Sequence, residues 1–380
     1  MGVQLRISIS DPDTELRAYV VVDSLRGGRA MGGTRMTESV DLDEVAGLAH
    51  AMTLKLALAG LPIGGAKAGI TCGLPAGPER DRRIEEFGQA VQPLLRGGIY
   101  LGADQGITHR DRDLFFTAAD FDVCESAVPD LPCGWAELWR HCDTITGFGV
   151  CQAIYAAVEA IDLPDDCRTV AIQGFGLVGR AVARDLSAQG YQVLAVADRH
   201  GTVVAKDGLD VAALLAATDS AGSIDRSRLP AGAQCRSEPD AWLDTEADIL
   251  VLAAGGDAVR IDNVDRVRAR IVVEGGNLAC TEAAAEKLAG RGVPVLPGIV
   301  ANCGGAAVTG LLLLGSAPRT DSAEELAAWL FDEVGRRIRN NIATLVERGR
   351  TDPRPFDQIA RDLALERLRE MDAAALTPAG

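Results

Sequence analysis

Two lysines stand in segments of this chain that are otherwise apolar or rich in glycine. Lys55 lies in MTLKLA at 52–57, and Lys67 ends LPIGGAK at 61–67. Their long side chains could simply extend to solvent. Alternatively, a charged ammonium group can bind a carboxylate, and one whose neutral form is favoured by burial and by a second cation can act as a general base. The two segments therefore predict either ordinary surface lysines or an anion-handling catalytic site.

A glycine-rich segment later in the chain predicts a dinucleotide site. GFGLVG at 174–179 follows an expected strand over 169–173 and opens an expected helix. In this context the glycines permit a tight turn, a close backbone approach to a pyrophosphate and close packing of helix on strand, and the helix N-terminus presents free N–H groups. The predicted cofactor contacts in this segment are Gly174, Phe175, Gly176, Leu177, Val178 and Gly179.

Asp198 and Arg199 bear on which dinucleotide is bound. Asp198 ends the next expected strand, 24 residues beyond Gly174, where an acid accepts a hydrogen bond from the ribose 2′-hydroxyl and repels a 2′-phosphate. Arg199 could instead pair with that phosphate, and Asp198 could merely end a strand. We predict NAD as the cofactor, with both residues near its adenosine ribose.

The elements expected around the two lysines belong to a sheet with covering helices. Asp41 and Glu44 form a capping-box pattern, and apolar residues at helical spacing follow them. In chain order we expect strands over 5–9 and 16–22, a helix from Asp41 to about Gly60, a glycine-rich loop over 64–69 and a helix over 82–95.

From about residue 145 helices alternate with short apolar segments, which predicts a parallel sheet with right-handed crossovers. After residue 315 this alternation stops, and Ser322 with Glu325 predicts the start of a long helix that closes at Gly349, followed by another helix from Pro355. The expected strands cover 169–173, 192–197, 249–253, 271–274 and 293–296.

Composition excludes several classes of partner. The 380 residues include 38 Lys and Arg against 54 Asp and Glu, a formal net charge of −16, which disfavours non-specific binding to nucleic acid or anionic lipid. Apolar runs are too short to span a bilayer, and the N-terminus lacks a signal-peptide pattern, so a cytoplasmic protein is expected. The nine cysteines include no Cys-x-x-Cys pair and only four histidines occur, so we expect reduced thiols and no metal site.

Several segments of the chain resemble those of the glutamate/leucine/phenylalanine/valine dehydrogenase family, in the same order along the sequence. The lysine and glycine segment at 52–70 is the most specific of them, and the resemblance extends over roughly 24–312. The matching segments are GGTRM at 32–36, MTLKLALAGLPIGGAKAGI at 52–70, GADQGIT at 102–108, TGFGV at 146–150, GFGLVG at 174–179, VEGGN at 273–277 and ANCGG at 301–305.

The resemblance implies an α/β architecture in three parts. An N-terminal α/β substrate and oligomerisation domain is expected over 1–143, and a Rossmann-type, doubly wound parallel-sheet dinucleotide domain over 144–315. C-terminal helices over 316–380 are expected to pack back on the first domain. Because the family assembles through its N-terminal domain, a homo-oligomer is expected.

The resemblance also assigns roles to single residues. Lys55 is expected to bind the substrate α-carboxylate, and Lys67 to be the catalytic lysine that activates water against an imine. Asp104 is expected to exchange protons with the amino or imino nitrogen. Gly64 and Gly65 would let the backbone approach the substrate closely.

Four further residues are expected near the cofactor because of their places in the family segments. Thr146 and Ala253 are predicted cofactor contacts. Asn277 and Asn302 are predicted to contact the nicotinamide ribose or the substrate, although either could instead cap a turn.

Two positions bear on the substrate side chain. Met31 stands where glutamate-specific relatives carry a lysine, and a buried methionine offers no charge for a second carboxylate. This favours apolar substrates, as in the leucine, valine and phenylalanine enzymes. Thr309 combines the shape of valine with the hydroxyl of serine, and admits a slightly polar or unusual side chain. Ile107, and the segment LAAGG at 252–256, depart from the family pattern.

Three hypotheses follow for the function. The first is an NAD-dependent L-amino acid dehydrogenase that reversibly deaminates an apolar, branched-chain or aromatic, amino acid to its 2-oxo acid and ammonia. The second keeps the enzyme but changes the reaction to an unusual imine or oxo acid of specialised metabolism. The third is a non-catalytic NAD-binding regulatory paralogue. The retained lysines and Asp104 favour the enzymes.

Overall fold

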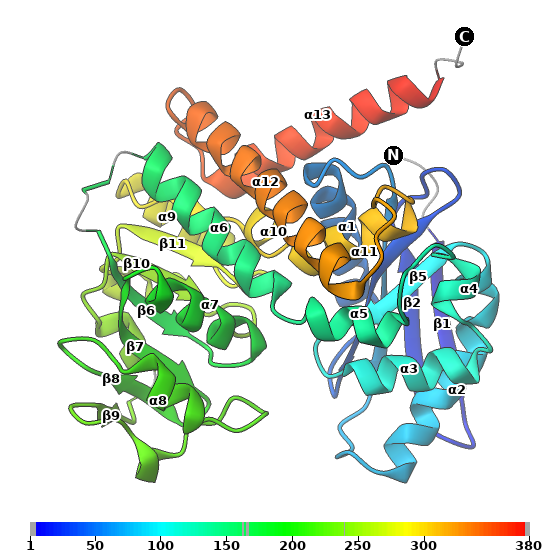
Figure 1. The fold of residues 1–380 in the computed structure, drawn as a ribbon, viewed down its shortest axis with the longest axis horizontal. Coiled ribbons are helices and arrows are strands. Elements are labelled where there is room, and N and C mark those ends of the chain that lie inside the picture. Colours follow the sequence, from blue (N-terminus) through cyan, green and yellow to red (C-terminus); the bar gives the residue numbers. More distant parts are fainter. Residues whose placement is uncertain (1–4, 162, 165–166, 239, 377–380) are drawn as a thin grey trace. The chain divides into compact units, whose positions relative to one another are not determined.

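The computed structural model describes residues 5–161, 163–164, 167–238 and 240–376, and its chain groups into two compact units (Figure 1). The first unit comprises Met1–His141, Ala306–Leu330 and Ala364–Gly380, and the second comprises Cys142–Gly305 and Phe331–Leu363. Contacts therefore assign parts of the C-terminal region to both units. The three-part division at 143 and 315 remains a prediction about domains.

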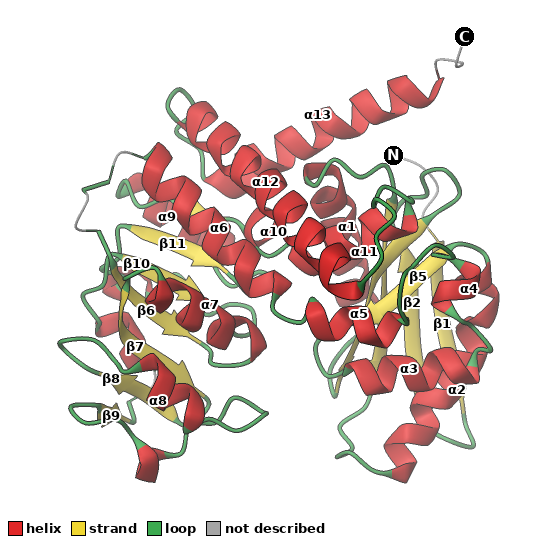
Figure 2. Cartoon of the chain, in the orientation of Figure 1, coloured by secondary structure: helices red, strands yellow, loops and turns green. Residues whose placement is uncertain are grey.

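A five-stranded sheet with covering helices forms the first unit (Figure 2). The expected strands near the N-terminus are confirmed as an antiparallel hairpin, and the other three strands run parallel to one another. In spatial order the strands are β1 (Leu5–Asp11), β2 (Leu16–Val22), β4 (Gly64–Thr71), β3 (Ala30–Thr37) and β5 (Ile99–Ala103). The parallel strands end at one edge, where polar side chains can gather.

Helix α1 (Leu42–Leu58) packs against β4 in this unit. Asp41 caps it as predicted, since the Asp41 carboxylate accepts a hydrogen bond of 2.8 Å from the Glu44 backbone N–H. Helices α2 (Pro78–Arg96) and α3 (His109–Ala118) pack together, with Phe87 of α2 against Phe115 of α3, and α3 crosses in front of the strands in Figure 1. The remaining helices of residues 78–141 are α4 (Val123–Ser126) and α5 (Trp135–His141).

The glycine-rich loop expected over 64–69 is wrong, because this segment is the buried strand β4. A Cβ built on Gly65 would lie 2.3 Å from the Thr53 backbone nitrogen and 2.5 Å from the Ala49 carbonyl oxygen of α1. The glycines thus permit α1 to pack directly on the strand backbone. Clustered glycines usually indicate a turn. Here they occur because a helix packs closely on the strand, which also requires residues without a side chain.

The second unit contains the predicted parallel sheet, which has seven strands. The strands expected over 169–173 and 271–274 are confirmed, and the other expected strands differ at their ends by one or two residues. Two strands that were not predicted extend the sheet antiparallel beyond β7. In spatial order the strands are β12 (Val295–Leu296), β11 (Ile271–Glu274), β10 (Ile249–Leu252), β6 (Thr169–Gln173), β7 (Gln192–Asp198), β8 (Gly201–Val204) and β9 (Gln234–Arg236).

Helices follow the strands of this sheet, and two long helices end the chain. The predicted start of the first long helix is confirmed, because Ser322 Oγ accepts a hydrogen bond from the Glu325 N–H at 3.2 Å. The α-helices are α6 (Ile145–Ala160), α7 (Leu177–Ala188), α8 (Val211–Ala216), α9 (Glu282–Gly290), α10 (Gly298–Ala301), α11 (Gly304–Leu313), α12 (Ala323–Gly349) and α13 (Phe356–Leu376). Single 3₁₀ turns cover Arg226–Arg228, Ala241–Asp244 and Val264–Arg266.

Candidate active site

Lys67 and Asp104 form an ion pair at the edge of the first sheet. Lys67 lies on β4 and Asp104 directly follows β5, and the Lys67 Nζ lies 3.0 Å from Asp104 Oδ2. Strand β3 lies between them, and a Cβ on its Gly33 would come within 2.9 Å of the Asp104 Cβ. A glycine at this position therefore leaves room for Asp104 against β3.

Two cations surround the Asp104 carboxylate. Burial alone would raise its pKa, but Lys67 and Arg35 together lower that pKa to about 2. Arg35 Nε donates to Asp104 Oδ2 at 3.1 Å, and Arg35 Nη1 donates to Glu44 Oε1 at 2.7 Å. Asp104 is therefore ionised at neutral pH, in the form that can accept a proton.

Both candidate lysines are buried, so the alternative in which they extend to solvent is wrong. Lys67 is 3% exposed, and Lys55, in the last turn of α1, is 8% exposed. Gly64 and Gly65 pack against protein backbone, since a Cβ on Gly64 would lie 1.8 Å from the Ser24 carbonyl oxygen. Packing alone explains these two glycines, and their predicted contact with substrate stays a prediction.

The residues expected to contact the substrate side chain are buried in the same unit. Met31 on β3 is 2% exposed, and Thr309 on α11 is 4% exposed. A Cβ on Gly310, next to Thr309, would lie 3.5 Å from the Met31 Sδ and 2.7 Å from the Leu61 Cδ1. Helix α11 therefore packs closely on an apolar group that includes Met31.

The predicted dinucleotide turn has the backbone geometry that its glycines require. Gly174 has φ of +94°, which strongly favours glycine, and a Cβ on Gly179 would lie 2.0 Å from the Gly174 carbonyl oxygen. Helix α7 begins at Leu177 with no side chain capping its first turn, and a Cβ on Gly176 would meet nothing within 4 Å. Free N–H groups and open space fit a pyrophosphate.

The side chains of this segment differ in exposure. Phe175 is 1% exposed, and therefore contributes to the core, whereas Leu177 is 51% exposed. Val178 lies beside the segment after β11, because its Cγ1 is 3.3 Å from the position of a Cβ on Gly275. The turn thus offers backbone and apolar surface, and its contacts with a cofactor stay a prediction.

Asp198 ends β7 as expected, but its carboxylate is fully hydrogen-bonded within the protein. Oδ1 accepts from the His200 N–H at 2.8 Å and from Arg226 Nη2 at 2.6 Å, and Oδ2 accepts from the Ile224 N–H at 2.8 Å and from Arg226 Nη1. The Asp198 side chain is 2% exposed, whereas the neighbouring Arg199 is exposed. A carboxylate has about four acceptor positions, so a ribose hydroxyl can bind only by replacing one of these donors.

The other predicted cofactor contacts lie in the second unit. Thr146 is in the first turn of α6, and Ala253 follows β10, where its carbonyl carbon is 2.7 Å from the position of a Cβ on Gly174. Asn302 Nδ2 donates to the Gly276 carbonyl at 2.9 Å and to Asn277 Oδ1 at 3.3 Å. The turn-capping alternative therefore describes Asn302 in this structure, and its contact with cofactor stays a prediction.

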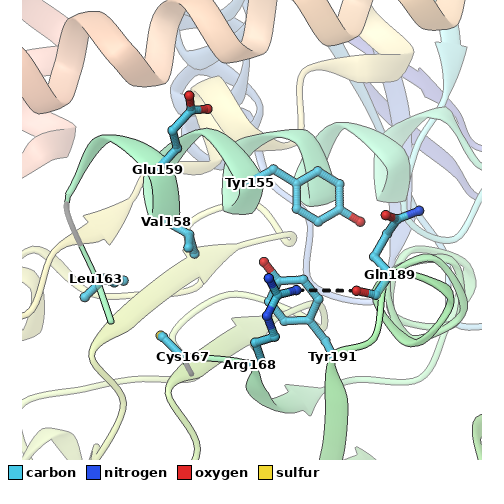
Figure 3. Close-up of a pocket in the computed structure, with 8 residues that line it drawn as sticks. All are labelled: Tyr155, Val158, Glu159, Leu163, Cys167, Arg168, Gln189 and Tyr191. Atoms are coloured by element: carbon cyan, nitrogen blue, oxygen red, sulfur yellow. Dashed lines mark hydrogen bonds between the residues drawn. The ribbon is translucent and has the colours of Figure 1, made fainter. Parts of the chain in front are cut away.

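A cavity of about 490 Å³ lies at the amino ends of β6 and β7, whereas the dinucleotide turn follows the carboxyl end of β6 (Figure 3). Tyr155, Arg168 and Tyr191 line it, and the Arg168 guanidinium lies 5.3 Å from the centre of the Tyr191 ring. Because ligands of open parallel sheets bind outside the carboxyl ends of the strands, this cavity is separate from the dinucleotide turn.

Membrane-spanning helices and metal-binding groups were also sought among the described residues. No helix in the described ranges is long and apolar enough to cross a membrane. The same ranges contain no group of three or more His, Cys, Asp or Glu side chains placed to hold a metal ion.

Sequence reasoning missed two arginines that contact predicted site residues. Arg35 is part of the GGTRM segment, and a cation that alternates with Met31 and Gly33 on a buried strand was a usable signal for an internal ion pair. Arg226 lies 28 residues beyond its partner Asp198, in a segment without periodicity, so only the fold could pair them.

Comparisons with known proteins agree with this geometry. A family model for Glutamate/Leucine/Phenylalanine/Valine dehydrogenase matches residues 140–374, and one for the Glu/Leu/Phe/Val dehydrogenase dimerisation domain matches residues 3–115. Glutamate dehydrogenase A2 of Halobacterium salinarum is 32% identical over 355 residues, covering 90% of this chain and 81% of that protein. The NADP(+)-dependent glutamate dehydrogenase of Pyrobaculum calidifontis is 33% identical over 343 residues, covering 84% and 77%.

A solved structure agrees as well. The crystal structure of the hetero-hexameric glutamate dehydrogenase of Thermus thermophilus in its Leu-bound form has a TM-score of 0.78 and 27% identity, covering 99% of this chain and 89% of that one. The resemblance drawn from the sequence segments is therefore confirmed, and the chain belongs to the glutamate/leucine/phenylalanine/valine dehydrogenase family of amino acid dehydrogenases, oxidoreductases that act on CH–NH2 donors.

Proposed function

We propose that this enzyme catalyses the reversible, NAD-dependent oxidative deamination of an apolar L-amino acid to its 2-oxo acid and ammonia. The observation that supports this most strongly is the buried Lys67–Asp104 ion pair, 3.0 Å long, in a unit that also buries Lys55. An ammonium group of the protein can pair with the carboxylate of an amino acid or its oxo acid, and a carboxylate of the protein can pair with the ammonium group of the amino acid.

Lys55 binds the substrate α-carboxylate in this proposal, and Asp104 accepts a proton from the substrate ammonium group. Nicotinamide, when bound, would supply the hydride acceptor for the substrate Cα, and loss of hydride from the neutral amine leaves an iminium ion. Lys67, once it has lost its own proton to solvent, takes a proton from a water molecule as the water oxygen bonds to the iminium carbon. Asp104 returns its proton to the nitrogen of the resulting carbinolamine, the C–N bond breaks, and the hydroxyl proton leaves with ammonia as ammonium, which gives the oxo acid.

The turn at Gly174–Gly179 is the proposed site of the cofactor pyrophosphate, and NAD is the proposed cofactor. Asp198 supports NAD because a carboxylate at the end of β7 disfavours a 2′-phosphate. Binding in this way requires the ribose hydroxyl to replace Arg226 at the carboxylate. NADP is the second candidate, since the Arg226 guanidinium neutralises Asp198 and could pair with a phosphate.

An apolar substrate side chain is proposed from Met31. A second carboxylate beside the buried Met31 thioether and Leu61 would be left without a cation, at a cost of several kcal/mol. Glutamate is the competing substrate, because the relatives named above are glutamate dehydrogenases. Thr309 keeps open the alternative of an unusual imine or oxo acid.

We also propose that the chain forms a homo-oligomer, since residues 3–115 match a dimerisation-domain model. The mass in solution, measured by light scattering at several concentrations, tests this. A monomer at every concentration would contradict it.

One experiment separates the proposed functions. NADH and NADPH oxidation are followed by absorbance with ammonium and a panel of branched-chain, aromatic and dicarboxylic 2-oxo acids. We expect the fastest turnover with NADH and an apolar oxo acid. Preference for 2-oxoglutarate would replace the proposed substrate. NADH binding with no turnover of any acid would indicate the non-catalytic paralogue, and turnover of cyclic imines alone would indicate the specialised reaction.

A further inference from the structure

Arg35 is a mostly buried cation to which the proposed reaction assigns no role. Its side chain is 13% exposed and lies between carboxylates on two different elements, Glu44 on α1 and Asp104 after β5. Together with Lys67 these residues form a line of alternating charges, with contacts of 2.7, 3.1 and 3.0 Å. The line runs inward from the partly exposed Glu44 to the buried Lys67, and burying its inner charges is costly unless each is paired.

Both cations bind the same oxygen of Asp104. Lys67 Nζ and Arg35 Nε each lie about 3 Å from Oδ2, whereas no hydrogen bond or ion pair to Oδ1 occurs among the described residues. The Oδ1 lone pairs are therefore available to a hydrogen-bond donor from outside the protein, such as a substrate nitrogen.

We propose that Arg35, anchored by Glu44, is a positioning residue that holds Asp104 by Oδ2 and thereby presents Oδ1 to the substrate nitrogen. This inference rests on the proposed function, in which Lys67 must release Asp104 in order to act on water and the imine carbon. Arg35 remains, because a guanidinium keeps its charge and its bond to Glu44 fixes its planar group.

The charges around Asp104 support separate roles for Arg35 and Lys67. The charged groups that face Asp104 are Lys67 from β4 and Arg35 from β3, and Glu44 from α1 faces Arg35. Burial favours the protonated form of Asp104, and the two cations oppose it. If Arg35 is removed, only Lys67 keeps the carboxylate ionised, so Asp104 is protonated at a higher pH.

The test compares Arg35→Gln, Arg35→Lys and Glu44→Gln with the wild type in the deamination direction. For Arg35→Gln we expect kcat to fall about 100-fold because Oδ1 is misplaced, and the amino acid KM to change less than about threefold because Lys55 is untouched. The acidic limb of the kcat/KM profile is expected to move upward by about one pH unit. Glu44→Gln should move it less, and Arg35→Lys should restore its position with only partial recovery of kcat.

Arg83→Gln is the matched control for losing a buried guanidinium. Arg83 is 12% exposed, lies in the same unit and pairs with Glu15 rather than with a candidate catalytic residue. This variant is expected to keep the wild-type pH profile. An active Arg35→Gln enzyme with an unchanged acidic limb, or an equal shift in Arg83→Gln, would overturn the proposal.

A second measurement does not need turnover. The lowered pKa of Asp104 stabilises the folded state above the ordinary pKa of an aspartate, and this contribution is lost as the pH falls toward about 2. Arg35→Gln should therefore lower the free energy of unfolding more at pH 7 than at pH 3, and should show no such pH dependence in an Asp104→Asn background. Absence of turnover by the wild type on every substrate would refute the proposed function. If instead the loss of unfolding free energy in Arg35→Gln has the same pH dependence with Asp104 and with Asn at that position, the proposed role of Arg35 in positioning Asp104 is wrong.

Discussion

Arg226 binds both carboxylate oxygens of Asp198, the acid at the end of β7 where a dinucleotide ribose is expected. The Asp198 pKa is correspondingly lowered: burial alone would raise it, and the Arg226 hydrogen bonds together with the Ile224 and His200 N–H groups reverse that effect. The carboxylate is thus charged and already occupied. Cofactor choice therefore depends on a competition between a ribose hydroxyl and a guanidinium.

Arg226→Gln should increase the preference for NADH. Removing the guanidinium frees acceptor positions on Asp198 and removes a cation that favours a 2′-phosphate, so we expect the NADH to NADPH ratio of kcat/KM to rise about tenfold. Asp198→Ala should lower the same ratio about tenfold. Arg228→Gln, at an exposed arginine of the same 3₁₀ turn, removes the same charge as a control. An unchanged ratio in both Arg226→Gln and Asp198→Ala would mean that another residue contacts the ribose.

Lys67→Ala should abolish turnover while NADH affinity, measured by fluorescence titration, stays near the wild-type value. Loss of a general base reduces the rate by about 10²–10⁴-fold, and Lys67 lies in the first unit, whereas the cofactor turn lies in the second. Lys206→Ala, at an exposed lysine, serves as the control for removing one cation. A Lys67→Ala enzyme with wild-type kcat would remove Lys67 from the mechanism.

Met31→Lys should shift substrate preference toward 2-oxoglutarate. An ammonium group beside Leu61 and Gly310 would pair with a second carboxylate and lose apolar contacts with a branched side chain. We expect the ratio of kcat/KM for 2-oxoglutarate over a branched-chain oxo acid to rise at least about tenfold. Met31→Leu, which keeps volume and polarity, should leave the ratio nearly unchanged. A ratio that fails to rise in a folded Met31→Lys enzyme would show that Met31 does not contact the substrate side chain.

Gly65→Ala should destabilise the protein through packing. The added Cβ would lie 2.3 Å from the Thr53 nitrogen of α1, so helix and strand must separate, at a cost of about 1–3 kcal/mol. Gly47→Ala is a matched control on α1, because its Cβ would meet nothing within 4 Å and alanine favours the helix by up to about 1 kcal/mol. Denaturant unfolding distinguishes the two, and equal stability of both variants would contradict the close packing of α1 on β4.

Local patterns predicted much of the second unit. We could predict the strand at 169–173, the glycine turn and the start of α7 because they depend on residues close together in the sequence. Gly174 needs a positive φ, and Gly179 must pack against the Gly174 carbonyl oxygen. Strands β8 and β9 were not predicted, since the short segments 201–204 and 234–236 pair only with each other and with the edge of a sheet that must already exist.

The contacts among the candidate catalytic residues could not be predicted in this way. Segment types and order identified Lys55, Lys67 and Asp104 as candidates, but the same glycines that drew attention to Lys67 led to a loop where the structure has β4. Spacing along a chain contains no information about which strand lies between two others.

The sequence by itself determined the family, the parallel sheet of the second unit and the identities of the candidate catalytic groups, because each depends on residue types within short segments. Only the tertiary structure decided which charges meet. Lys67 and Arg35 converge on Asp104 because β4, β3 and β5 are neighbours, and Arg226 occupies Asp198 because a distant loop folds back on β7. Electrostatic attraction acts through space over a few ångströms, so its partners are set by strand order and loop path rather than by distance in sequence.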